Sequence, residues 1–179
     1  MPLTMKVDDT IRLNILEALL KKGAVSPNIK QLQKETGYHK ATIKTSLDFL
    51  SKEGIITGYG PKIDIKKLGY KIEAITFLQL DLTKKNSLEN FIEQIKKDDN
   101  TYMLAGLVGP GNFNLIARHI YQDIESYYKD TNKKYFETLQ GIYNLIKNKE
   151  TFYITEPTYK TNSRTESLIK SLRKQKGLE

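Results

Sequence analysis

Two stretches that each end at a glycine constrain this chain more than any other feature of its sequence. The first runs from Asn28 to Gly37 and the second from Tyr38 to Gly54, where an apolar run begins. Gln31 follows Asn28 at the spacing of a capping box, which marks a helix start. Glycine is the residue most often found just past a helix end. The pattern therefore predicts a short helix, a turn, and a second helix of about four turns.

The second predicted helix has two contrasting faces. Ile43, Leu47 and Leu50 recur at helical spacing and form one apolar stripe. The opposite face carries short donors and cations: His39, Lys40, Thr42, Lys44, Thr45 and Ser46. No carboxylate occurs between His39 and Leu47, and an acid there would be repelled by phosphate. An ordinary amphipathic pair with a solvated face is the alternative. The missing acid and the apolar run behind the pair favour a helix-turn-helix with a short wing or strand.

In a helix-turn-helix the second helix lies in the DNA major groove, so its polar face is the candidate DNA contact. Four side chains are expected to meet base edges or nearby phosphates: Lys40, Thr42, Thr45 and Ser46. The phosphate backbone is expected to be contacted by His39 and Lys44. Further contacts are expected from two residues behind the wing, Tyr59 and Lys62.

The charge of the chain is concentrated at its two ends. Of a net +8, residues 1–62 carry ten basic and six acidic side chains, and residues 160–179 carry six and two. Residues 63–159 carry thirteen of each. Lysine-rich surfaces also serve solubility, but this localisation weakens that explanation. A basic end beside a neutral middle indicates a polyanion-binding module joined to a second domain.

Several functional classes have little support in the composition. The chain has no cysteine, which excludes disulfides, thiolate catalysis and thiolate metal sites. Its only histidines, His39 and His119, lie far apart in the sequence, which argues against a histidine metal site or a Ser-His-Asp arrangement. We therefore expect no catalytic residue, metal or cofactor, and no enzyme. No apolar run reaches ~18 residues and no signal-peptide core is present, so we expect a cytoplasmic protein without a membrane partner.

The flanking segments predict further elements. A first helix would be capped by Asp8, Asp9 or Thr10, would end near Lys21-Lys22-Gly23, and would bury an apolar stripe: Ile11, Ile15, Leu16, Leu19 and Leu20. Strands are predicted at 71–82, 101–108, 113–120 and 143–160, with a turn at 109–112 that makes the middle pair an antiparallel hairpin. One helix is predicted around 88–95, capped by Asn86 and Glu89, and another from Asp123 to Gly141, with Ile124, Tyr127, Tyr128 and Tyr135 on its apolar side.

The order strand, helix, strand, strand, helix, strand is that of a ferredoxin-like domain. Helices cover one face of such a sheet, and dimerisation commonly covers the other. The predicted fold class is α+β, with an N-terminal winged helix-turn-helix domain and a C-terminal ferredoxin-like βαββαβ domain followed by an extra basic helix. The expected boundaries are 1–60 for the DNA-binding domain, 61–70 for a linker, 71–160 for the effector and dimerisation domain, and 161–179 for a basic extension.

The whole order resembles the Lrp/AsnC family of transcription regulators, from about Val7 to Tyr159. The most specific similarity is the junction Glu53-Gly-Ile-Ile-Thr-Gly-Tyr-Gly60, with Ile63-Asp64 and Lys67-Leu-Gly-Tyr70, which resembles the family pattern EEGVIKGYG…D…KLGY. Val108-Gly-Pro-Gly-Asn-Phe-Asn114-Leu resembles the family's TGxYDLL hairpin, and Gly141-Ile142 its PGV. The resemblance implies a winged helix-turn-helix followed by a βαββαβ effector and assembly domain.

Two departures from the family pattern affect the expected sites. Thr45 and Ser46 stand where the family often has arginine, so the base preference should differ. Asn114 stands where the hairpin commonly ends in aspartate, and an amide holds an ammonium group less well than a carboxylate does. Members that bind an amino acid place it near this hairpin, which implies a candidate effector site at Gly109, Gly111, Asn112 and Asn114. A plain hairpin turn explains these residues equally well.

The sequence thus predicts a sequence-specific transcriptional regulator that binds double-stranded DNA as a homodimer or higher homo-oligomer. An amino acid or other small-molecule effector would modulate it. One alternative is an architectural, weakly specific DNA-binding protein without an effector. Another is a metabolic enzyme or ligand-binding protein built on the ferredoxin-like domain. For residues 161–179, phosphate contacts, docking to a neighbouring subunit and a frayed tail all stay open.

Overall fold

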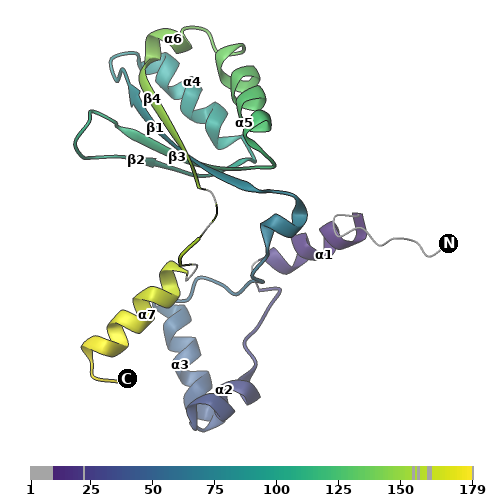
Figure 1. Ribbon diagram of the computed structural model, residues 1–179. Coiled ribbons are helices and arrows are strands. Elements are labelled where there is room, and N and C mark those ends of the chain that lie inside the picture. The colour runs from purple at the N-terminus through teal and green to yellow at the C-terminus, as the bar shows by residue number, and fades with distance from the viewer. Residues whose placement is uncertain (1–9, 22, 155, 157, 161–162, 179) are drawn as a thin grey trace, which may run out of the picture. The chain divides into compact units, whose positions relative to one another are not determined.

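The computed structural model describes residues 10–21, 23–154, 156, 158–160 and 163–178 (Figure 1). The expected cap residues Asp8 and Asp9, and Lys22 at the end of the first helix, lie outside the described residues. The chain divides into two compact units, Met1–Gly69 (unit 1) and Tyr70–Glu179 (unit 2). No helix in the described part of the chain has the length and apolar character needed to cross a membrane.

The described residues of unit 1 form the α-helices α1 (Thr10–Leu20), α2 (Ile29–Thr36) and α3 (Lys40–Lys52). α2 and α3 pack against each other, whereas α1 has no comparable packing against either of them among the described residues. The prediction that α1 buries an apolar stripe is therefore wrong for Ile11, Ile15 and Leu20, whose exposed fractions are 70%, 54% and 59%. Leu16 and Leu19 are half-buried. An amphipathic stripe is buried only where another element offers it a face.

Unit 1 closes with a short 3₁₀ turn, η1 (Ile65–Leu68). The side chain of Asp64 accepts a hydrogen bond from the Lys66 backbone N–H at 3.1 Å, and this starts the turn. Gly69 ends it with φ of 91°, a left-handed conformation that glycine adopts without strain.

Unit 2 has the predicted strand and helix order. Its elements are β1 (Ile72–Leu80), α4 (Lys85–Lys96), β2 (Thr101–Gly106), β3 (Leu115–Tyr121), α5 (Ile124–Thr131), η2 (Asn132–Phe136), α6 (Ile142–Leu145), β4 (Ile146–Ile154) and α7 (Arg164–Gln175). The four strands form one antiparallel sheet in the order β2-β3-β1-β4. This α+β architecture and the antiparallel hairpin confirm the prediction.

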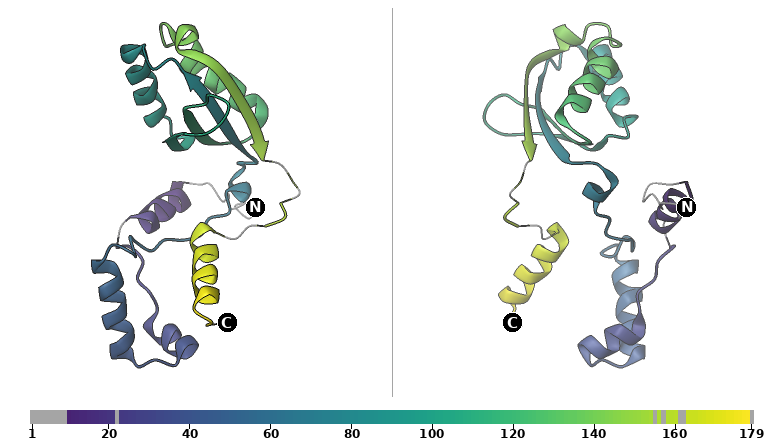
Figure 2. Two further views of the ribbon diagram at one scale, coloured as in Figure 1. Left: turned by 90° about the vertical axis from the view of Figure 1, so that its left-hand side faces the viewer. Right: turned by 45° about the vertical axis from the view of Figure 1, so that its right-hand side comes forward.

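Helices cover one face of this sheet, as Figures 1 and 2 show for α4 and α5. Alternate β1 residues face that helix layer and are buried: Ala74, Thr76, Leu78 and Leu80. The main core adds Phe91 and Ile95 from α4, and Leu145 from α6. The residues between them on β1, including Ile75 and Phe77, point to the other face.

Three local predictions in unit 2 are wrong or shifted. Asn86 and Glu89 do not cap α4, because the helix begins at Lys85 and its N-cap is Lys84, which makes no side-chain cap hydrogen bond. On α5, Tyr127 is buried as expected, but Ile124 and Tyr128 are 44% and 51% exposed. The strand predicted at 143–160 is shorter than expected, because α6 occupies residues 142–145 and β4 runs from Ile146 to Ile154.

The long predicted helix after Asp123 begins as expected. The carboxylate of Asp123 accepts the Ser126 backbone N–H at 2.7 Å. The helix then widens into a π-helical turn, η2, which ends before Gly141 and brings Tyr135 into the core. The extension forms α7, whose N-terminus is capped by Ser163, and whose apolar residues Leu168, Ile169 and Leu172 are 55%, 50% and 42% exposed.

Candidate nucleic-acid interface

Local hydrogen bonds fix the α2-turn-α3 segment. The Asn28 side chain accepts the Gln31 backbone N–H at 3.1 Å, which confirms the predicted cap. The reciprocal half of the capping box is absent, because the Gln31 amide donates to Glu35 at 2.8 Å instead. Gly37 has φ of 73°, and its N–H donates to the Gln33 carbonyl at 2.9 Å. These contacts stop α2 and turn the chain toward α3.

The N-terminus of α3 has features that suit an anion. Its N-cap is His39, which has extended backbone and gives no side-chain hydrogen bond to the first turn. That first turn contains no acidic residue and begins with Lys40. The N–H groups and the dipole at a helix start favour negative charge, so nothing in the side chains of this turn opposes an approaching phosphate.

The two faces of α3 differ as predicted. Ile43 is 6% exposed, and Leu47 and Leu50 are half-buried. The candidate DNA-binding side chains on the opposite face are all exposed: His39, Lys40, Thr42, Lys44, Thr45 and Ser46. Lys62 is exposed as well, and Tyr59 is half-buried. The polar face is therefore available to a partner along its whole length.

A surface hollow brings cations of α2 and α3 together. Lys40 and Lys44 line it beside Lys30 and Gln33 of α2, and no acidic side chain of the described residues contributes to its wall. The sequence analysis missed Lys30 and Gln33. Their spacing of three residues on a predicted helix was the available signal, because it places them on one face.

A second hollow connects α3 with the segment that follows it. Lys44 and Tyr59 both line this hollow, together with Asp48 and Ser51. Thr42, Thr45, Ser46 and Lys62 line neither hollow, since they lie on open surface. Lys44 therefore lines both hollows, beside Lys40 in the first and beside Tyr59 in the second.

Behind α3 the sequence predicts a short wing or strand, and the structure contains no strand between residues 53 and 64. Gly54 has φ of 69°, and the backbone N–H groups of Ile55 and Ile56 both donate to the Leu50 carbonyl, at 2.9 and 3.1 Å. Ile55 is 67% exposed and Ile56 is half-buried. The segment is an irregular wing, because no second strand is present to pair with it in the described part of unit 1.

The candidate effector residues of the β2–β3 hairpin have two different roles. Gly109, Gly111 and Asn112 are exposed, and Asn112 has φ of 61° at the turn. Asn114 is half-buried, and its amide makes two hydrogen bonds to Leu80: its oxygen accepts the backbone N–H at 3.0 Å and its nitrogen donates to the carbonyl at 2.8 Å. The register of β1 against β4 shifts at this point. Asn114 thus ties the hairpin to the end of β1.

The described residues contain no cluster of histidine, aspartate and glutamate side chains that is able to hold a metal ion. His119 lies on β3, as predicted, and its imidazole Nδ1 is 2.8 Å from the Thr101 hydroxyl. Burial lowers the pKa of His119 to about 4, so its imidazole is neutral at physiological pH.

Sequence comparison relates the chain to transcription regulators with a helix-turn-helix. It is 31% identical over 129 residues to a proline dehydrogenase transcriptional activator of Rhizobium radiobacter, covering 70% of this chain and 78% of that protein. It is 29% identical over 118 residues to the HTH-type transcriptional regulator Ptr1 of Methanocaldococcus jannaschii, covering 66% and 75%. No family model matches the chain.

Solved structures share its fold. The Neisseria meningitidis regulator NMB0573, in complex with L-Met, superposes with a TM-score of 0.62 at 14% identity, covering 87% of this chain and 94% of that one. AsnC of E. coli superposes with a TM-score of 0.59 at 21% identity, and the match covers 86% of this chain and 97% of that one. Fold and sequence together define a helix-turn-helix transcription regulator. The chain belongs to the Lrp/AsnC family.

Proposed function

We propose that this regulator recognises specific DNA sequences by placing α3 in the major groove. The observation that carries the proposal is the exposed face of α3, which has donors and cations but no acid from His39 to Leu47. Hydroxyl and ammonium groups of this kind reach base edges and phosphates.

The proposed roles follow from position. Lys40, Thr42, Thr45 and Ser46 meet base edges or adjacent phosphates, whereas His39 and Lys44 contact the backbone. Tyr59 and Lys62 add contacts from the wing. Lys30 and Gln33 join this set, because they share a hollow with Lys40 and Lys44. The proposed partners are double-stranded DNA and further copies of the chain, in the cytoplasm, and no catalytic step belongs to the proposal.

The open face of the sheet supports self-association. Phe152 and Ile154 on β4 are 54% and 41% exposed. On the neighbouring strand β1, Ile75 pairs with Phe152, and the ring centre of Phe77 lies 5.8 Å from that of Phe152. An apolar surface of this kind is a typical interface. We propose that two copies pair through it, so that two α3 helices reach major-groove sites ~34 Å or a multiple of that distance apart.

The same proposal includes an amino-acid-sized effector near the β2–β3 hairpin. The L-Met complex of the Neisseria regulator motivates it. In this chain the exposed turn residues Gly109, Gly111 and Asn112 are the candidates for contact. Asn114 is proposed as a support of the turn, because its amide is occupied by Leu80. Calorimetric titration with the twenty amino acids tests this part, and no heat for any of them removes it.

The deciding experiment for DNA recognition is selection of bound fragments from the source genome, followed by footprinting at physiological salt. A pseudo-palindromic motif with half-sites one helical turn apart is the expected result. Thr45→Ala with Ser46→Ala should change the preferred bases, whereas the same test on exposed Lys129→Ala in unit 2 should not. Uniform binding without a motif would instead support an architectural role, and no binding would refute the assignment.

Self-association is tested separately by sedimentation. Phe152→Glu places a charge on the open sheet face and should shift the protein toward the monomer. Tyr143→Glu is a matched control, because Tyr143 is a 75% exposed aromatic on α6, away from that face. Equal behaviour of the two variants would argue against the sheet as the interface.

A further inference from the structure

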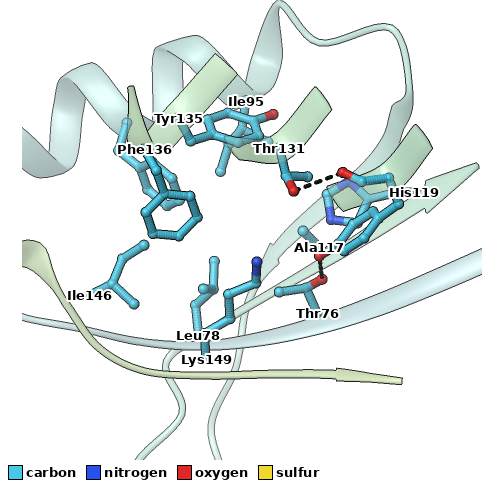
Figure 3. A pocket seen from close by; sticks show the side chains of 12 residues that line it. Thr76, Leu78, Ile95, Ala117, His119, Thr131, Tyr135, Phe136, Ile146 and Lys149 are labelled. Carbon is cyan, nitrogen blue, oxygen red and sulfur yellow. Dashed lines mark hydrogen bonds between the residues drawn. The ribbon is translucent and has the colours of Figure 1, made fainter. Parts of the chain in front are cut away.

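The helix-covered side of the sheet encloses a small cavity that contains one cation (Figure 3). Its wall is mostly apolar and aromatic, with Leu78 from β1, Phe91 and Ile95 from α4, and Phe136 from η2. Lys149 of β4 completes it. The centre of a water molecule can occupy about 30 Å³ of this space, which is room for about two waters.

Lys149 enters the cavity because of its register on β4. It pairs with Leu78 of β1, which is 3% exposed and faces the helix layer. Figure 3 shows the ammonium nitrogen directed into the ring of lining side chains. The nitrogen lies 5.5 Å from the ring centre of Tyr127 and 5.2 Å from that of Phe136. Lys149 is half-buried, and a lysine at a core-facing strand position is unusual, since charged groups that lose hydration in proteins are normally paired.

The lysines around this layer differ in their partners. Lys134 reaches the carboxylates of Asp98 and Asp130, at 2.8 and 2.9 Å. The ammonium of Lys149 instead lies over the rings of Tyr127 and Phe136. In the described part of the chain, no carboxylate lies within ion-pair distance of it. Cation–π contacts offset part of the lost hydration. An anion in the cavity would supply the missing counter-charge.

The other polar groups around the cavity already have hydrogen-bond partners, and the Tyr135 hydroxyl donates to the Asp98 carboxylate behind the wall at 2.7 Å. Thr76 and Tyr127 share a hydroxyl–hydroxyl hydrogen bond of 3.0 Å, and Thr131 donates to the Tyr127 carbonyl at 2.8 Å. His119 also lines the wall, and its low pKa leaves it uncharged at physiological pH. Among the lining side chains that the structure describes, the charged group is therefore the ammonium of Lys149.

The backbone beside the cavity is also irregular. Tyr135 and Phe136 line it from η2, a π-helical turn. Such turns are rare, and those that are known often lie at functional sites. The inserted residue widens the helix and redirects side chains.

We propose that this cavity binds a small monocarboxylate of formate or acetate size, with the carboxylate against the Lys149 ammonium. The methyl end of acetate then lies against Leu78, Phe91 and Ile95. The space fits fewer heavy atoms than an amino acid with an apolar side chain has, so this site differs in ligand class from the hairpin site and lies beyond the proposed function. Bound anion links β4 to α4 and η2, which stabilises the helix layer on the sheet.

Thermal unfolding of the full chain in sodium salts at constant ionic strength tests the proposal. Formate and acetate should raise Tm in a saturable way, by about 5 °C at ten times the Kd. Butyrate, which is too long, and chloride should give no saturable rise. Lys149→Met should abolish the effect. Lys129→Met, which removes an exposed lysine from α5, should retain it.

A second measurement locates the ligand in the unmodified protein. Acetate labelled with ¹³C in its methyl group should give nuclear Overhauser contacts to the side chains of Phe91 and Ile95. This readout decides the matter even if Lys149→Met fails to fold. Contacts only to other residues, an equal response to butyrate or chloride, or an unchanged response in a folded Lys149→Met protein would each overturn the proposal.

Discussion

The two units of this regulator are stabilised in different ways. Among the described residues, Ile43 is the only hydrophobic side chain of unit 1 that is buried, whereas unit 2 has a continuous core from β1 through α4 to α6. Unit 1 is held mainly by caps and turns, and it leaves Phe49 and Ile55 58% and 67% exposed. Regions with few buried apolar contacts open most readily. The difference indicates that unit 1 is the less stable of the two units.

The largest effect is expected in the core of unit 2. Phe91 is 3% exposed and packs edge-on against Tyr135, at 5.8 Å between ring centres. Phe91→Ala should lower the free energy of unfolding of unit 2 by about 3–5 kcal/mol, because it removes a buried ring and leaves a cavity. Chemical denaturation with amide exchange of β1 as the probe measures it. Tyr143→Ala, at a 75% exposed position, should change this value by less than about 0.5 kcal/mol.

Acid should weaken unit 2 through His119. Burial lowers the pKa of its imidazole from 6.5 to about 4 in the folded protein. Between these values the unfolded chain binds a proton that the folded chain does not, so stability falls as the pH falls from 6.5 to 4. By pH 4 the expected loss in the free energy of unfolding is about 3 kcal/mol. The loss disappears as the pH rises above 6.5, because the unfolded chain then no longer binds the extra proton.

Amide exchange of β3 at several pH values measures this loss, and His119→Gln should remove most of the dependence in that window. The matched control is His39→Gln, which replaces an exposed histidine of unit 1. If both variants keep the same acid profile in unit 2, groups other than His119 control it.

Truncation of Ile43 should affect unit 1 alone. Ile43→Ala should lower the stability of the α2–α3 pair by about 2 kcal/mol, because it removes the most buried apolar side chain of that pair. Amide exchange should become faster in α3 and stay unchanged in β1. Equal loss of protection in both units would show that they unfold together, which would remove the contrast drawn above.

Sequence patterns predicted the structure where a local rule decides it. The Asn28 and Asp123 caps, the Ile43 stripe and the antiparallel hairpin all follow from short spacings, and all are present. The order of strands and helices along unit 2 was also predicted, because alternation, helical spacing and turn residues indicate it. Two of these features position the candidate DNA-binding face, so its exposure was predictable as well.

Predictions failed where distant packing decides the outcome. The stripe of α1 is amphipathic, yet Ile11 and Ile15 are exposed because α2 and α3 offer it no face. For Asn114 the sequence left an effector contact and a plain hairpin turn open, since nothing local shows that its amide bonds to Leu80, which is 34 residues away. The same holds for Lys149, since nothing local in the sequence shows which face of the sheet its side chain lies on. Only its pairing with Leu78 shows that it faces the helix layer.

The smallest effects come from two matched helix caps, one in each unit. The Asn28 side chain accepts the Gln31 N–H at 3.1 Å, and that of Asp123 accepts the Ser126 N–H at 2.7 Å. Replacing either cap by alanine should destabilise its helix by about 1 kcal/mol. Because α2 braces α3 and unit 1 has little other core, Asn28→Ala should also weaken DNA binding. Asp123→Ala should leave binding unchanged, because the unit 2 core holds α5 in place. Fluorescence anisotropy with an operator fragment measures both. Equal affinities for the two variants would mean that DNA itself orders unit 1 strongly enough to compensate for the lost cap.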